Sequence, residues 1–397
     1  MPLMLTGVAT SQSVINNTQS QTAPVTTSQT LDVVDVSGST AGVTDSTGNS
    51  LMGAVTSGSL AVTSGQTLSA DVTSSTTLNV VTNAGASTIL NTASTGNTAD
   101  IETVTGGGPV TGTLTQSVGA VNVLATNSIS ASGAQTGSLS TSTQAIANSV
   151  GLTTDASRVT AITSQSSAAV TDAEDGGTLT YTPGTAAFSA AAVSNNLTGS
   201  GSGGANQTIN ATQTMTGART QAGEFAYLGN AQTAQASATA SDNNITLSGG
   251  GGALNVVDSQ TNTSYTRAQA VLSSYQFGAA QASAYGVGNS VLAANVGPSM
   301  SLDNTQTNSG GGVEVIASFT GNNGYDAVSS AAAMGNAATG FACSSCGGVI
   351  SATNNQLNSG GVSAASTIDI AASNRSVTGT ATAVGNNATF YVSKPSN

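Results

Sequence analysis

The chain has 397 residues and a formal net charge of −12, yet charged residues make up only 6% of it, where about a quarter is typical of globular proteins. Its five cations lie too far apart to form a basic patch, which argues against nucleic-acid binding. These cations are Arg158, Arg219, Arg267, Arg375 and Lys394. No run approaches the 18 or more apolar residues of a membrane-spanning helix, so the sequence predicts none.

Small and polar residues dominate the chain, which contains 48 Gly, no Trp and no His, with aromatic residues at 3%. Large apolar side chains are too thinly spread for one thick core, whereas stacked coils need only a few small apolar residues each. Thr and Val recur throughout, and both suit pleated backbone. We therefore predict an all-β chain of repetitive, stacked coils, similar to a β-solenoid or β-helix. Disorder of the first half is the alternative.

Residues 1–25 form the first segment. Residues 1–10 are mostly apolar and resemble the tail of a secretion signal that lacks its basic start. We interpret the segment as the remnant of an export signal, or as a polar lead-in whose apolar part is the first strand.

Residues 26–180 are rich in Ser, Thr and Gly. We predict that they form a β region with less regular coils. Short β-patterned fragments alternate there with turn residues, as at residues 29–34 and 77–81. The densest acidic group, Asp172, Glu174 and Asp175, is expected to be a solvated junction loop. Its spacing fails the EF-hand pattern.

Residues 181–397 contain an internal repeat of about 50 residues, a length typical of solenoid units. A Gly-Asn pair recurs at spacings of 59, 47 and 50 residues. Glycine allows a positive φ at a corner, and asparagines at equivalent turns can stack their amides in a hydrogen-bonded ladder. The predicted repeat turn positions are Gly229, Asn230, Gly288, Asn289, Gly335, Asn336, Gly385 and Asn386.

Cys343 and Cys346 form a Cys-x-x-Cys motif. No βαβ context supports a redox role, and zinc would need two further His or Cys ligands that the chain lacks. The pair predicts a small disulfide loop formed in an oxidising compartment. We expect no metal and no cofactor.

The sequence predicts a structural, adhesive protein and not an enzyme. Without His there is no Ser-His or Cys-His dyad, and without Trp there is no indole platform for sugars. Neutral strand faces rich in hydroxyls and amides offer hydrogen bonds to polysaccharide. Residues 388–392 form a good strand five residues from the end, which predicts possible self-association by edge pairing.

The whole-chain pattern resembles the holdfast anchor proteins of stalked alphaproteobacteria, in particular the D component of the holdfast-attachment set. The resemblance rests on the polar opening at residues 11–21, the Thr/Ser/Gly-rich first half and the Gly-Asn repeats from Tyr227 to the ending Tyr391-Val392-Ser393. It implies export through a curli-type outer-membrane channel and a place at the outer membrane on the cell surface.

The resemblance further implies that the chain, with sister anchor proteins, tethers an adhesive polysaccharide to the envelope. No catalytic residues come with this family, and the missing basic signal start departs from it. Two alternatives remain: a self-assembling, curli-like fibre subunit, and a generic adhesin passenger domain without an anchoring role.

Overall fold

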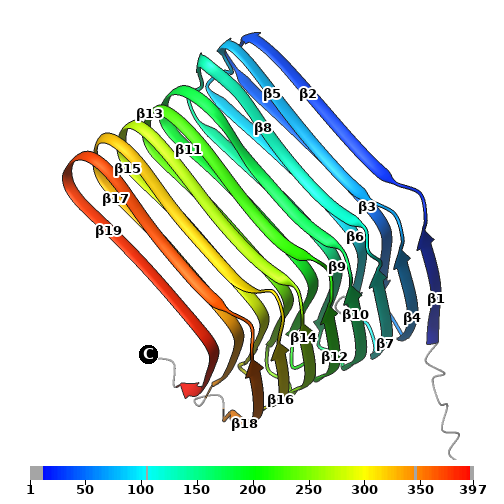
Figure 1. Ribbon diagram of the computed structural model, residues 1–397. Coiled ribbons are helices and arrows are strands. Elements are labelled where there is room, and N and C mark those ends of the chain that lie inside the picture. Colours follow the sequence, from blue (N-terminus) through cyan, green and yellow to red (C-terminus); the bar gives the residue numbers. More distant parts are fainter. Residues whose placement is uncertain (1–11, 104–105, 344–346, 394–397) are drawn as a thin grey trace, which may run out of the picture.

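A computed structural model describes residues 12–103, 106–343 and 347–393. The described chain is a β-solenoid without helices, as predicted. Eight coils stack side by side from β1 to β19 (Figure 1). In this part of the chain no helix is present that could cross a membrane.

Each coil begins with one short strand, and these strands form a parallel sheet of eight, the first sheet. Its strands, in spatial order, are β1 (Gln12–Gln21), β4 (Ser59–Leu68), β7 (Val110–Val118), β10 (Val159–Ser167), β12 (Gln207–Met215), β14 (Leu254–Asn262), β16 (Ser299–Asn308) and β18 (Val349–Asn358).

The rest of each coil runs out to a bend and returns, and these segments form the parallel second sheet. In the first three coils the bend separates two strands. These are β2 (Val25–Asp35) and β3 (Ser39–Val55), β5 (Val72–Asn83) and β6 (Ser87–Thr103), and β8 (Asn122–Gln135) and β9 (Leu139–Asp155).

In the last five coils one long strand continues through the bend. These strands are β11 (Val170–Ser202), β13 (Arg219–Gly249), β15 (Tyr265–Asn295), β17 (Gly312–Cys343) and β19 (Val362–Ser393). β11 crosses the boundary expected at residue 180, and the region expected to be less regular continues the same stack.

The interior is slender because alanine dominates it. Between the outgoing and returning halves of the long strands lies a core of small side chains such as Ala222, Ala236 and Ala282. Larger residues such as Leu197, Ile245 and Leu254 fill the space between the returning halves and the first sheet. The small residues that make the sequence look poor in core material thus fit the narrow space between two closely packed strand layers.

A ladder of asparagines runs through all eight coils where these two cores meet. There the burial alternation of the returning half shifts by one residue, as at Asn243 in β13. Each of the first seven side-chain Nδ2 atoms donates to Oδ1 of the asparagine in the next coil at 2.7–2.9 Å. The ladder consists of Asn49, Asn97, Asn148, Asn195, Asn243, Asn289, Asn336 and Asn386.

A second ladder of glutamines runs along the first sheet with the opposite polarity. From the second coil on, each Nε2 donates to Oε1 of the glutamine in the preceding coil at 2.7–2.9 Å. The members are Gln19, Gln66, Gln116, Gln165, Gln213, Gln260, Gln306 and Gln356. Because these buried amides are paired, they avoid the cost of an unsatisfied polar group.

The two ladders also bind each other's strands. Gln213 donates to the carbonyl of Asn244, directly after Asn243, and Asn195 donates to the carbonyl of Thr214, directly after Gln213. The same reciprocal bonds recur along the stack. Side-chain amides therefore connect each coil both to its neighbours and across its own interior.

Candidate functional site

Three of the four predicted Gly-Asn pairs occupy equivalent positions in successive coils. Asn289 donates to Asn336 at 2.8 Å, and Asn336 donates to Asn386 at 2.7 Å. Gly288, Gly335 and Gly385 precede them, and a Cβ at Gly335 would lie 2.5 Å from the Gly385 carbonyl oxygen. The pairs lie inside strands β15, β17 and β19 and not at turns.

The fourth pair lies elsewhere. Asn230 stands at the bend, where its register partners are Tyr181 in β11 and Gln276 in β15. Gly229 precedes it, and a Cβ there would lie 2.2 Å from the Thr180 carbonyl oxygen. The ladder residue of this coil is Asn243, which explains why the first spacing, at 59 residues, is longer than the others.

Sequence reasoning missed the rest of both ladders. The glutamines are separated by 46–50 residues throughout, and the asparagines by 46–51. A search for one residue type at this spacing would have found both. The signal was hidden because Asn and Gln also occur at many exposed positions.

Cys343 ends β17 and is buried, while Cys346 lies outside the described residues. The disulfide between them stays a prediction. Residues 1–10, interpreted above as part of a signal remnant or lead-in, also lie outside the described ranges, as does Lys394.

The expected solvated loop at the acidic group is wrong, because these residues lie in β11 and two of them are buried. Asp172 is 5% exposed and pairs with Arg219 of the next coil at 2.7 Å. Burial raises the pKa of Asp172, although the hydrogen bond and charge of Arg219 oppose the shift. Arg219 thus compensates a carboxylate that its neighbours shield from solvent.

Asp175 lies deeper, in register with Glu224 of the next coil. Thr141 donates to Asp175 at 2.5 Å, while neither carboxylate oxygen of Glu224 has a partner in the described chain. Burial raises the pKa of Asp175 to about 7, and burial and the charge of Asp175 raise that of Glu224 well above its usual value. No group of three or more metal-ligating side chains occurs among the described residues.

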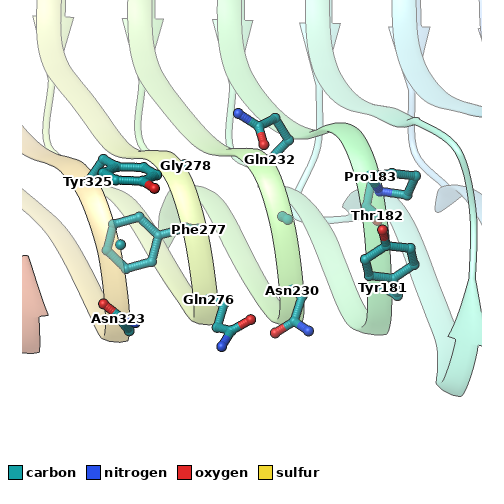
Figure 2. Close-up of a pocket in the computed structure, with 12 residues that line it drawn as sticks. Tyr181, Thr182, Pro183, Asn230, Gln232, Gln276, Phe277, Gly278, Asn323 and Tyr325 are labelled. Atoms are coloured by element: carbon teal, nitrogen blue, oxygen red, sulfur yellow. The ribbon is translucent and has the colours of Figure 1, made fainter. Parts of the chain in front are cut away.

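A groove crosses the bends of β11, β13, β15 and β17 and is here named the bend groove (Figure 2). One wall carries a row of side chains from successive coils, each in register with the next. This row consists of Tyr181, Asn230, Gln276 and Asn323. Figure 2 shows Asn230, Gln276 and Asn323 on neighbouring coils along one edge of the groove.

The opposite wall lies two residues further along each strand and consists of Pro183, Gln232, Gly278 and Tyr325. Phe277 lies between the walls and packs edge-to-face on Phe319, with ring centroids 4.9 Å apart. Gly324 permits this arrangement, because a Cβ there would lie 2.3 Å from the Phe277 ring. The groove has a volume of about 370 Å³, within the range of ligand sites.

The groove amides differ from those of the interior ladders. In the described chain, Asn230, Gln276 and Asn323 make no side-chain hydrogen bond, whereas the ladder amides are paired with one another. No charged residue lines the groove. It therefore presents unpaired donors and acceptors between two exposed aromatic rings, Tyr181 and Tyr325.

In a comparison with protein-family models, the model described as holdfast attachment protein D matches residues 34–312, more than half of the chain. This range runs from β2 to the start of β17 and includes most of the bend groove. No curated protein and no solved structure matches the chain.

Proposed function

We propose that this chain, which belongs to the holdfast attachment protein D family, fastens an adhesive polysaccharide to the cell envelope as a structural component and not as an enzyme. Membership of the family implies a role in holdfast attachment and a cell-surface location. The direct link to the envelope is the step that we add.

The observation that carries the proposal is the continuity of the two amide ladders through all eight coils. A tether must resist pulling, and in this stack each coil pairs with the next along most of its length. Buried ladder amides add bonds between the same coils. Many bonds would have to break together before two coils separate, which suits a part that transmits force.

The proposal extends to the export route and the partners. A curli-type outer-membrane channel would deliver the chain, and sister anchor proteins would join it at the outer membrane. The absence of His from the sequence supports a non-catalytic role.

Deleting the gene tests the anchoring role. We expect cells that still make the adhesive polysaccharide but release it intact into the medium, so that surface attachment is lost. The measurement is the amount of polysaccharide on washed cells and in the supernatant, with the restored gene as control. Polysaccharide that stays on the deletion cells would contradict the proposal.

A second candidate function, self-assembly into fibres, is favoured by the polarity of the ladders. Asparagine amides donate toward β19 and glutamine amides donate toward β1. At the ends of the described stack, Asn386 and Gln19 therefore offer N–H groups, while Asn49 and Gln356 offer amide oxygens. A head-to-tail contact between two copies would continue both ladders.

Electron microscopy and fibre diffraction of the purified protein test this candidate. Self-assembly predicts filaments with a strand spacing of about 4.7 Å along the fibre. The substitution Gln19→Glu should weaken assembly, because it keeps the oxygen that accepts from Gln66 but replaces the N–H offered to Gln356 of the next copy with a carboxylate. Material that stays monomeric at high concentration would exclude the fibre function.

A further inference from the structure

We propose that the bend groove is a binding site for an uncharged polysaccharide strand lying along the stack, across the bends of β11, β13, β15 and β17. This inference rests on the proposed function and adds to it the place of contact and the class of sugar. The position of the groove, its chemistry and its difference from the same edge in the first three coils support this site.

The position suits an extended chain molecule. The row of Tyr181, Asn230, Gln276 and Asn323 crosses four coils that are joined by parallel pairing. With strands about 4.8 Å apart, the row spans about 14 Å along the stack. A regular polymer placed along this direction would meet one polar side chain in each coil.

The chemistry suits sugar. The C–H faces of a pyranose ring pack on aromatic rings, and its hydroxyls bond to groups that both donate and accept. Tyr181 at one end and Tyr325 at the other are 43% and 50% exposed, and they come from opposite walls. Between them, the amides of Asn230, Gln276 and Asn323 offer both kinds of hydrogen bond without a competing partner in the described chain.

The charges favour an uncharged ligand. No lining residue is charged, and the nearest acidic side chain in sequence, Asp326, pairs with Arg375. The whole chain carries a formal charge of −12, which repels polyanions. A uronate polymer would therefore meet neither a cation in the groove nor an attractive long-range field.

The aromatic residues are confined to the later coils. In the first three coils the register positions of the amide row are Asp35, Asn83 and Gln135. Asn83 is used internally, since it donates to the carbonyl of Val36 at 2.8 Å and accepts from the backbone N–H of Gly85. At Tyr181 the edge thus gains its first aromatic side chain, and it differs from the Asn83 position, where the amide is used internally.

Binding of the purified full-length chain to immobilised polysaccharide, released from the producing cells, tests the site. A neutral glucan oligosaccharide and an oligogalacturonate serve as defined soluble competitors. We expect the double substitution Tyr181→Ala with Tyr325→Ala, and separately Gln276→Ala, to weaken binding to the immobilised polysaccharide by about tenfold. The neutral oligosaccharide should compete better than the acidic one.

Tyr227→Ala is the matched control, because Tyr227 is 49% exposed on β13 but does not line the groove. Circular dichroism melting should be the same for all variants. The chain has no Trp, and two of its seven tyrosines line the groove, so ligand should change the tyrosine fluorescence of the wild type but not that of the double variant.

The outcomes separate this inference from the proposed function. If the wild type binds neither the polysaccharide nor either oligosaccharide, or if Tyr227→Ala weakens binding equally, the groove is not the site. Preferential binding of the oligogalacturonate, or of an apolar peptide, would also overturn the proposal. If binding depends on the groove but the deletion strain keeps its polysaccharide attached, the site stands and the anchoring function fails.

Discussion

Replacing Asn243 by alanine is expected to lower the free energy of unfolding by about 3 kcal/mol or more. Asn243 is fully buried, donates to Asn289 at 2.8 Å and to the carbonyl of Thr261 at 3.0 Å, and accepts from Asn195 at 2.8 Å. The substitution removes one hydrogen bond from each of these three groups and leaves Oδ1 of Asn289 without its donor, while Nδ2 of Asn195 keeps its bond to the carbonyl of Thr214. Each buried unsatisfied group costs about 1–3 kcal/mol.

Asn255→Ala is the matched control, because Asn255 lies on β14 with its side chain exposed. Its effect should stay within about 0.5 kcal/mol. Urea unfolding followed by circular dichroism measures both variants against the wild type. Equal stability of the two variants would mean that the ladder contributes little to the stack. Because each coil contacts only its neighbours, the loss of stability should be greatest in the coil that contains Asn243 and in the two coils beside it.

The asparagine ladder could be predicted only in part from the sequence alone. Composition, the period near 50 residues and the recurrence of Gly-Asn predict a stacked β-structure with asparagine amides in contact. The same dipeptide at Gly229-Asn230 misleads, because a Gly-Asn pair fits both a shift in burial within a strand and a bend. Local sequence does not distinguish these two settings, since coil pairing decides which asparagine is buried.

The bend groove and the buried acids could not be predicted for a related reason. Tyr181 and Tyr325 are 144 residues apart in the sequence, and only the pairing of four coils brings them to one groove. Likewise, Asp175 looks like part of a solvated acidic group, and only the register places it next to Glu224 inside the stack. The role of these few aromatic and acidic residues depends on their position in the coil, and no local sequence motif predicts it.

Asp258→Asn is expected to make the protein more stable at pH 8, by an amount on the order of 5 kcal/mol. Asp258 is 2% exposed, and neither of its carboxylate oxygens has a partner in the described chain. Burial, with a smaller contribution from the charge of Asp303, raises its pKa to about 8. The folded protein therefore keeps a proton on Asp258 that the unfolded chain releases near pH 4.

The direction of the pH dependence of stability follows from this difference between the folded and the unfolded pKa of Asp258. Between about pH 4 and pH 8 the folded state binds more protons at Asp258 than the unfolded state, so stability falls as the pH rises through that window. Three more buried acids have raised pKa values and make stability fall more steeply with pH: Asp175, Asp242 and Glu224. The wild type should melt at a higher temperature at pH 5 than at pH 8.

An asparagine at position 258 removes the contribution of Asp258 to the pH dependence of stability. It also offers a hydrogen-bond donor to a neighbouring side chain. The register partner Asn304 has a buried Oδ1 without a donor among the described residues, while its Nδ2 donates to Asn354 at 2.5 Å. A second amide in line would supply the missing donor and extend this pair to three coils. The gain over the wild type should therefore be largest at pH 8 and shrink toward pH 4.

Asp303→Asn is the control that separates the effect of burial from the effect of the neighbouring charge on the pKa of Asp258. It removes the neighbouring exposed charge but leaves the buried carboxyl, so it should flatten the pH dependence only slightly. Thermal melting from pH 4 to pH 9 by circular dichroism measures all three proteins. If Asp258→Asn were no more stable than the wild type at pH 8, Asp258 would have to be solvated in the folded protein. The buried position at β14 would then be wrong, because a carboxylate in contact with water pays no desolvation cost.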